Sequence, residues 1–342
     1  MVIQEKISLS ALTTFQLGGS ARYFVIVKSI PELKEAVTFS KKESLPFFVL
    51  GEGSNTLVPD EGFAGLVIKN EIRGIKMKEK KGEDGKFLIE VGAGENWDSF
   101  VALTIFQKLY GLENLSYIPG SVGGAPVQNI GAYGAEVKEV ITEVEVFDTK
   151  MMKTRLLPAK ECKFAYRDSI FKREAGRHLI ITKVIFELGK KGRVNIGYKD
   201  LRAHFKDRYS SAVLPGEVRD AVVAIRKKKL PDWKVTATAG SFFKNPFVSK
   251  AHFEKLKKTY PEMPGFAEEG KIKIPLAFIL DKVCNLSKFR NGNVALYESQ
   301  PLAVVNLGGA TFLEVKQFAS LIAIKIKEKT GIEAEWEVRV ME

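Results

Sequence analysis

One stretch of sixteen residues, 119–134, contains no charged side chain, although 27% of the whole chain is charged. Its sequence, PGSVGGAPVQNIGAYG, has five glycines and two prolines and almost no bulky apolar side chain. A buried core segment needs Leu, Ile or Phe, and a solvated linker is usually rich in Ser, Lys and Glu. A further interpretation is a backbone that lies against a ligand and binds it through main-chain N–H groups.

A second glycine loop, GEGSNTL at 51–57, directly follows LPFFVL, which is typical of a buried strand. Glycine permits positive φ and close backbone approach, and Ser54, Asn55 and Thr56 add short donors suited to phosphate oxygens. Neither loop has the Gly-Lys-Ser/Thr of a Walker A motif or the spacing of a Rossmann GxGxxG turn. Each loop alone is typical of an ordinary tight turn, but the two together favour a large anionic cofactor.

Composition narrows the class of protein. A chain of 342 residues that is 45% hydrophobic is long enough for two or three domains with ample core. It has no apolar run near the roughly 18 residues of a membrane span. Its first residues lack a basic region followed by an apolar stretch, so we expect no secretion signal. Cys162, Cys284 and the three histidines share no ligand-like spacing, so we expect reduced cysteines and no metal site. The net charge of +12 is scattered, and its densest cluster, IRKKKLPDW at 225–233, is short, which favours solubility over nucleic-acid binding.

The pattern along the chain predicts a mixed α+β organisation. Ser29 and Pro31 predict a helix start, and the helix that follows KFLIEVGAGE has a core-facing stripe and is expected to stop near Gly111. The sequence becomes more helical from about 210, and chiefly from 250 to 330. Further predicted elements are strands at 141–148 and 178–188, a helix at 312–331 and a closing strand at 334–340.

Five motifs occur in order between about Thr14 and Val340: LGEGSNTLVPDEGFAGLVI, IPGSVGGAPVQNIGAYG, CKFAYRDSIFK, GSFFKNP and EVRV. This ordered set resembles the first subtype of the UDP-N-acetylenolpyruvoylglucosamine reductase (MurB) family. The resemblance implies an α+β fold with a two-lobed FAD-binding domain of the vanillyl-alcohol-oxidase (PCMH) type and an α+β substrate-binding domain. The implied boundaries are 1–69 for the first lobe, 70–209 for the second, and 210–342 for the substrate domain, whose last strand could return to the first lobe.

The resemblance implies an FAD-dependent oxidoreductase in which NADPH is the hydride donor and FAD is bound non-covalently. The implied reaction reduces UDP-N-acetylglucosamine enolpyruvate to UDP-N-acetylmuramate, a step of bacterial peptidoglycan synthesis on which cell shape and division depend. We expect a cytoplasmic monomer that binds a UDP-linked amino-sugar substrate, with no nucleic-acid or membrane partner.

The resemblance also assigns residues to roles. The implied FAD-binding residues are Gly51, Gly53, Ser54, Asn55, Thr56, Pro119, Gly120, Ser121, Gly123, Gly124, Gln128, Asn129, Gly131, Ala132 and Tyr133. The implied substrate-binding residues are Tyr198, Lys229, Asn245 and Gln300. The family usually has Gly after the tyrosine of the closing loop, whereas this chain has Lys199.

Three residues are implied to be catalytic: Arg167 grips the substrate carboxylate, Ser241 is the general acid, and Glu337 assists at the carboxylate end. Each has a structural alternative. Arg167 could form a salt bridge to Asp168, and Ser241 could cap a helix or turn. Glu337 could take an outward strand position beside Arg339, and alternation along AEWEVRV does not separate it from Glu335.

Two other functions fit parts of the sequence. An FAD-dependent oxidase or dehydrogenase of the same fold would act on a 2-hydroxy acid or sugar and often tethers its flavin to histidine. No histidine precedes His178, which counts against that bond. A non-catalytic basic nucleotide-binding protein would need interleaved aromatic and basic residues for an RNA platform, which the sequence lacks.

Overall fold

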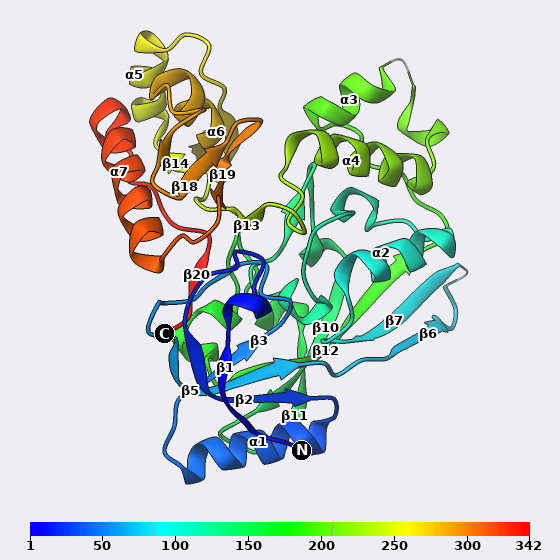
Figure 1. Cartoon of the computed structure of the whole chain (residues 1–342). Coiled ribbons are helices and arrows are strands. Elements are labelled where there is room, and N and C mark those ends of the chain that lie inside the picture. The colour runs from blue at the N-terminus through cyan, green and yellow to red at the C-terminus, as the bar shows by residue number, and fades with distance from the viewer. Residues whose placement is uncertain (84, 207) are drawn as a thin grey trace. The chain divides into compact units, whose positions relative to one another are not determined.

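The computed structural model describes residues 1–83, 85–206 and 208–342, and the helices and strands below are those of this part of the chain (Figure 1). The chain forms two compact units, each assembled from segments that are distant in sequence. Unit 1 comprises Met1–Ile7, Arg22–Glu52 and Ala64–Arg226, and unit 2 comprises Ser8–Ala21, Gly53–Phe63 and Lys227–Glu342.

The first sheet of unit 1 is covered by one amphipathic helix, α1 (Ile30–Lys42). Its strand order is β1 (Gln4–Ser8), β2 (Ser20–Val27), β5 (Phe63–Asn70) and β3 (Phe47–Leu50). The helix begins as predicted, because Ser29 Oγ accepts a hydrogen bond from Glu32 N at 3.4 Å and Pro31 lies in the first turn. The helix buries Leu33 and Val37 together with core side chains of β2 and β5.

The second sheet of unit 1 is antiparallel and carries α2 (Trp97–Phe106) on one face. Its strand order is β11 (Lys153–Pro158), β10 (Ile141–Asp148), β12 (Leu179–Gly189), β7 (Lys86–Gly92) and β6 (Ile75–Glu79). The ring centroids of Phe100 on α2 and Phe186 on β12 lie 4.9 Å apart. The predicted stop near Gly111 is wrong: the helix ends at Phe106, because Lys108 has a φ of 58° and turns the chain.

A smaller cluster in unit 1 is built on α3 (Lys199–Phe205) and α4 (Pro215–Lys229). Leu201 and Phe205 of α3 and Val218 and Val222 of α4 are buried together in it. A short hairpin, β8 (Gly131–Ala132) and β9 (Ala135–Glu136), closes the end of the chargeless stretch.

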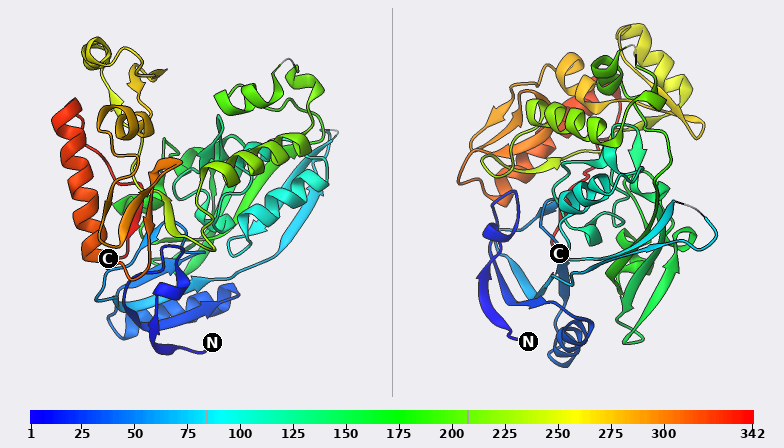
Figure 2. Two further views of the ribbon diagram at one scale, coloured as in Figure 1. Left: turned by 45° about the horizontal axis from the view of Figure 1, so that its top comes forward. Right: turned by 90° about the vertical axis from the view of Figure 1, so that its right-hand side faces the viewer.

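Unit 2 contains two small sheets, a strand pair and a long helix (Figure 2). The first sheet has the order β13 (Ala237–Ser241), β19 (Gln300–Asn306), β18 (Val294–Tyr297) and β17 (Arg290–Asn291). The second has the order β14 (Phe247–Val248), β16 (Lys271–Lys273) and β15 (Phe266–Glu268). The strand β20 (Arg339–Val340) is parallel to β4 (Thr56–Leu57), and the helices are α5 (Lys250–Thr259), α6 (Leu276–Phe278) and α7 (Phe312–Thr330).

The long helix α7 confirms the prediction for residues 312–331. Thr311 and Glu314 form a capping box at its start, and Gly331 ends it with a φ of 69°. Phe318 and Ile322 of α7 are fully buried in the core of unit 2. Within the described residues, no helix is both long and apolar enough to cross a membrane.

Two sequence predictions for the second half are corrected by the structure. Residues 250–330 are not mainly helical, since they hold β15 to β19 as well as α5 to α7. The closing strand covers only Arg339–Val340 rather than 334–340, because its partner β4 offers two residues for pairing. Upstream of it, Trp336 forms an isolated bridge with Phe243.

Candidate active site

In unit 1, the backbone of the chargeless stretch is fastened to the turn between β7 and α2. Trp97 N donates to Gly120 O at 2.9 Å, and Gly123 N donates to Ala93 O at 2.9 Å. A Cβ added at Gly123 would lie 2.6 Å from Ala93 Cβ. The close packing of this loop therefore requires glycine at 123.

The two glycine loops have the features that a diphosphate-bearing cofactor requires. In unit 1, a Cβ added at Gly51 would lie 2.5 Å from Ser121 Oγ, so these loops touch because residue 51 has no side chain. Gly53 has a φ of 67°, and a Cβ there would lie 2.3 Å from Leu12 O. A left-handed glycine followed by short polar residues is typical of an anion-binding nest, which fits the diphosphate of FAD.

Arg167 lies against the end of the chargeless stretch in unit 1. Its Nη2 donates to Gly131 O at 2.8 Å, and its backbone is left-handed, with a φ of 50°. The sequence left open a salt bridge between Arg167 and Asp168. In the structure Asp168 pairs with Arg173 instead, with 2.7 Å between Arg173 Nη2 and Asp168 Oδ2. The Arg167 guanidinium is thus directed at the predicted flavin loop.

Asn129 is fully buried and its side-chain amide holds the loop itself. Its Nδ2 donates to Glu136 Oε2 at 2.9 Å and to Ala165 O at 3.1 Å, and its Oδ1 accepts from Lys138 N at 3.1 Å. These bonds keep the loop in shape around a left-handed residue, since Asn129 has a φ of 44°.

The rings of Tyr133 and Tyr198 meet edge to face in unit 1, with centroids 5.3 Å apart. Burial raises the pKa of Tyr133 to about 12, so this phenol is neutral at physiological pH. Tyr198 directly precedes α3 and is 46% exposed, which leaves part of its ring available to a ligand.

The structure separates the two glutamates that the sequence left equivalent. Glu337 in unit 2 is only 8% exposed, its backbone N donates to Phe242 O at 2.8 Å, and its carbonyl accepts from Asn55 Nδ2 at 3.2 Å. Glu335 points outward and pairs with Lys244. Of the two glutamates, Glu337 is therefore the one that lies beside Asn55.

Ser241 is the last residue of β13 and caps no helix. The strand is irregular just before it, with a register shift between Thr238 and Ser241 and a φ of 75° at Gly240. Within the described chain, the Ser241 hydroxyl forms no side-chain hydrogen bond and is half-buried. An irregular strand end of this kind re-aims a side chain, which is a common feature of active sites.

The predicted substrate-binding residues lie at element boundaries. Lys229 ends α4, and Asn245 follows β13 and accepts from Leu276 N at 2.9 Å through its Oδ1. Gln300 begins β19, and its buried Oε1 has no hydrogen-bond partner within the described residues. No group of three His, Cys, Asp or Glu side chains suited to a metal ion occurs among residues 1–83, 85–206 and 208–342.

Two family profiles match the chain in consecutive regions. The profile described as an FAD binding domain matches residues 21–150, which include both glycine loops. The profile described as the C-terminal domain of UDP-N-acetylenolpyruvoylglucosamine reductase matches residues 232–341, which include Ser241, Asn245, Gln300 and Glu337.

Full-length relatives decide the family. The chain is 38% identical to UDP-N-acetylenolpyruvoylglucosamine reductase of Flavobacterium johnsoniae over 100% of both chains. It is 39% identical to the protein of the same name from Neisseria gonorrhoeae, over 97% of this chain and 95% of that one. The chain belongs to the UDP-N-acetylenolpyruvoylglucosamine reductase family.

A solved structure of a UDP-N-acetylenolpyruvoylglucosamine reductase family member has the same architecture. The crystal structure of UDP-N-acetylenolpyruvylglucosamine reductase (MurB) from Thermus caldophilus covers 100% of both chains with a TM-score of 0.68 and 26% identity. The predicted α+β flavoenzyme fold is thereby confirmed. Three predicted site residues, Arg167, Tyr198 and Lys229, lie between the two regions that the profiles match. The match to the full-length relatives covers these residues.

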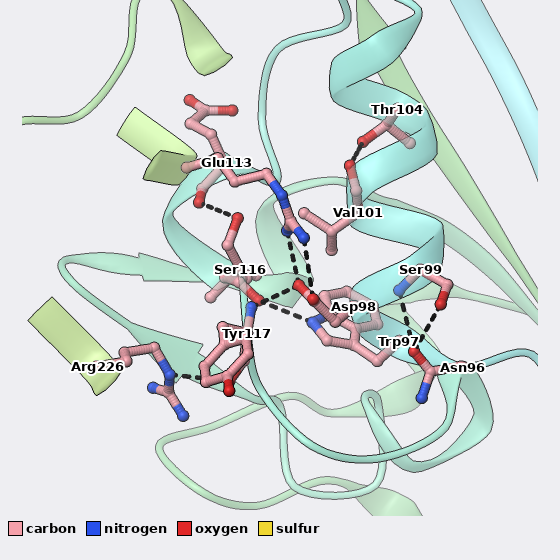
Figure 3. A network of polar contacts seen from close by, with 12 residues as sticks. Asn96, Trp97, Asp98, Ser99, Val101, Thr104, Glu113, Ser116, Tyr117 and Arg226 are labelled. Atoms are coloured by element: carbon pink, nitrogen blue, oxygen red, sulfur yellow. Dashed lines mark hydrogen bonds and ion pairs between the residues drawn. The ribbon is translucent and has the colours of Figure 1, made fainter. Parts of the chain in front are cut away.

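A polar network in unit 1 of this family member was missed by the sequence analysis (Figure 3). Asp98 on α2 accepts from both Nη atoms of Arg219 on α4, at 2.6 and 2.9 Å, and from Tyr117 N at 2.6 Å. Arg226 Nε donates to Tyr117 O at 2.9 Å. Burial raises the pKa of Asp98, but the hydrogen bonds from Arg219 and Tyr117 outweigh it and leave that pKa below its usual value. Asp98 and Arg219 are 121 residues apart, so no local pattern indicates the pair.

Proposed function

We propose that this protein is an NADPH-dependent, FAD-containing UDP-N-acetylmuramate dehydrogenase. It reduces UDP-N-acetylglucosamine enolpyruvate to UDP-N-acetylmuramate in bacterial peptidoglycan synthesis. The observation that carries the proposal is family membership along the whole length of the chain. The glycine loops at 51–57 and 119–134 support it, since their backbones fit a diphosphate-bearing cofactor.

The cofactor and the residues have separate tasks. FAD would be held by the glycine loops at 51–57 and 119–134, and when bound it would supply the hydride chemistry that links NADPH to the terminal carbon of the substrate double bond. Negative charge then builds on the neighbouring carbon and its carboxylate. Arg167 binds that carboxylate, because a guanidinium fork holds two oxygens and stays charged as the negative charge grows. Its position on Gly131 O, at the end of the flavin loop, supports this role.

Protonation of the neighbouring carbon completes the reaction. Ser241 supplies this proton: a hydroxyl is a weak acid, but an enolate carbon is a base strong enough to take its proton. Glu337 assists at the carboxylate end, and its burial beside Asn55 supports a placed rather than a solvated carboxyl group.

The rest of the substrate is bound by four side chains. Lys229 and Asn245 bind the diphosphate, Tyr198 closes over the substrate, and Gln300 contacts it. The buried Oε1 of Gln300 accepts no hydrogen bond from the described residues, which supports a role in accepting one from the substrate.

We further propose that the enzyme is a cytoplasmic monomer without nucleic-acid or membrane partners. The division into FAD-binding lobes 1–69 and 70–209 and a substrate domain 210–342 is part of this proposal. The scattered positive charge of the sequence supports the absence of a nucleic-acid partner. The separate matches to residues 21–150 and 232–341 support a division between FAD-binding and substrate-binding domains.

The cofactor part of the proposal is tested by the visible spectrum of the purified protein. We expect a yellow protein whose flavin absorbance is bleached by NADPH under anaerobic conditions. Acid precipitation should release all the colour, since neither glycine loop contains His or Cys. Colour that stays with the precipitate would refute non-covalent binding, and a colourless protein that gains no flavin on incubation with FAD would refute the flavoenzyme.

A further inference from the structure

In unit 1, the side chain of Asn114 joins two segments that the proposed function assigns to different ligands. Asn114 lies in a 3₁₀ turn, Glu113–Leu115, and is 2% exposed. Its Nδ2 donates to Tyr133 O at 2.8 Å and to Asn195 O at 2.7 Å. Tyr133 lies at the end of the chargeless flavin loop, and Asn195 lies three residues before Tyr198. Both hydrogens of one buried amide are thus used to tie the flavin loop to the segment that carries Tyr198.

Asn195 and Tyr198 each add a contact to the end of the flavin loop. Asn195 Nδ2 donates to Gly134 O at 2.8 Å. Within its own segment, Asn195 Oδ1 accepts from Gly197 N at 3.1 Å, which fixes the backbone just before Tyr198. The ring of Tyr198 then meets the ring of Tyr133, whose carbonyl Asn114 holds. The position of Tyr198 is therefore set relative to the end of the flavin loop rather than by α3 alone.

The chemistry of the site explains why an asparagine is needed. A primary amide supplies two N–H donors from one nitrogen, which two backbone carbonyls from different segments can share. An apolar side chain of similar size would leave the Tyr133 and Asn195 carbonyls without this donor. The two segments would then be held by the more exposed Asn195 side chain and by the ring contact.

We propose that Asn114 is a positioning residue that sets Tyr198 in place for the enolpyruvyl substrate. This inference rests on the proposed function. Asn114 acts through Tyr133 and Asn195, and the residues assigned to the chemistry itself, Arg167, Ser241 and Glu337, are outside its bonds.

The test is the steady-state kinetics of the FAD-loaded Asn114→Leu enzyme with UDP-N-acetylglucosamine enolpyruvate. We expect KM for this substrate to rise by at least about tenfold, since the variant removes two buried hydrogen bonds, with kcat within about twofold of wild type. Ser116→Ala is the matched control. It removes a buried bond from Ser116 Oγ to Glu113 O, 2.7 Å long, just after the same turn and leaves both bonds of Asn114 intact, so KM should be unchanged.

A second variant keeps the inference testable if Asn114→Leu fails to fold. Asn195→Ala alters an exposed side chain and removes its hydrogen bond to Gly134 O while the Asn114 amide remains, so KM should also rise, but by a smaller factor. A folded Asn114→Leu or Asn195→Ala enzyme with wild-type KM would overturn the inference, as would an equal rise in Ser116→Ala. Failure of the proposed function would look different, because the wild-type enzyme itself would then not reduce the substrate.

Discussion

A hydroxyl has to give up its proton to a carbon in the proposed reaction, and Ser241 lies at a strand end where it could do so. The residue before it has a left-handed backbone, so Gly240 re-aims the chain at this point. Within the described residues the Ser241 hydroxyl is not engaged by another side chain, which leaves its hydrogen for a ligand. The structure thus removes the helix-cap alternative, and the catalytic role of Ser241 stays a prediction.

The Ser241→Ala substitution tests this role, because the two hydride transfers make different demands on it. Flavin reduction by NADPH requires no proton at a substrate carbon and should proceed at a near-normal rate. Flavin reoxidation by the enolpyruvyl substrate should slow by roughly 10²–10⁴-fold, the usual contribution of a placed proton donor. Anaerobic stopped-flow absorbance measures both half-reactions.

Ser241→Cys provides the matched control for Ser241→Ala. A thiol is a stronger acid of similar reach, so reoxidation should recover part of the loss. An alanine enzyme that is reoxidised at the wild-type rate would remove Ser241 from the chemistry and make Glu337 the next acid to test.

At the scale of the structural element, the loop 119–134 combines positions where a side chain is forbidden with positions where it is tolerated. Gly123 and Gly124 are neighbours in one 3₁₀ turn. A Cβ at Gly123 would lie 2.6 Å from Ala93 Cβ, whereas a Cβ at Gly124 would meet only Ser121 Oγ, at 3.6 Å. One glycine is needed for the fold of the loop, and the other leaves its backbone open to a ligand.

This difference predicts that Gly123→Ala lowers the free energy of unfolding of the apoprotein by about 1–3 kcal/mol, the cost of an overpacked site. Gly124→Ala should change the same quantity by less than about 0.5 kcal/mol, as is usual for a substitution without strain. Urea denaturation of the flavin-free proteins gives both values. Equal losses in the two variants would contradict the proposed packing of the loop on Ala93.

The contact between α2 and α4 depends on Asp98, which binds both Arg219 and the backbone of Tyr117 (Figure 3). The pKa of Asp98 is lower in the folded protein than in the unfolded chain. Its carboxylate therefore stabilises the fold above the unfolded pKa of about 3.9, and this stabilisation is lost as the pH falls through the lower folded pKa.

Asp98→Asn should accordingly destabilise the protein by about 1–3 kcal/mol at pH 7, and the difference from wild type should shrink below about pH 4. Urea denaturation between pH 3 and 7 measures this difference. Glu174→Gln is the control, since it removes an exposed pair with Arg177 and should have little effect at any pH. A deficit for Asp98→Asn that is the same at pH 3 as at pH 7 would show that charge plays no part in the contact.

At the scale of the whole molecule, local signals in the sequence predicted those elements whose ends are fixed by neighbouring residues. The helix at Ser29 has its cap and its proline within three residues, and α7 has both its capping box and its terminal glycine in the sequence. The alternating strand β10 was predicted at its observed bounds, Ile141–Asp148. These features depend on residues a few positions apart, which a sequence displays directly.

Features that depend on distant residues were not predictable. The strands β18 and β19 complete a sheet with β13, which lies some sixty residues earlier, so the sequence near them does not indicate this pairing. Apolar and polar residues alternate along the whole segment 334–340. Only Arg339–Val340 forms a strand, because its partner strand β4, Thr56–Leu57, has only two residues. Glu337 differs from Glu335 through contacts with residues that are distant in sequence, Asn55 for Glu337 and Lys244 for Glu335. Asp98 likewise differs from other acidic residues on helices through its bond with Arg219.

For the candidate site, the glycine loops could be inferred from residue types alone, since a chargeless stretch of this length has few uses in a protein. The catalytic assignments came from the resemblance to a family and remain predictions. The buried amide of Asn114 gave no signal, because one asparagine in GLENLSY is typical of any turn.

The central claim is that this chain passes hydride from NADPH to UDP-N-acetylglucosamine enolpyruvate through FAD. It is tested most directly by reducing the anaerobic enzyme with one equivalent of NADPH and then adding the enolpyruvyl substrate. We predict that the bleached flavin absorbance returns in full, with formation of one equivalent of UDP-N-acetylmuramate. A flavin that NADPH bleaches but that stays reduced in the presence of this substrate would contradict the account.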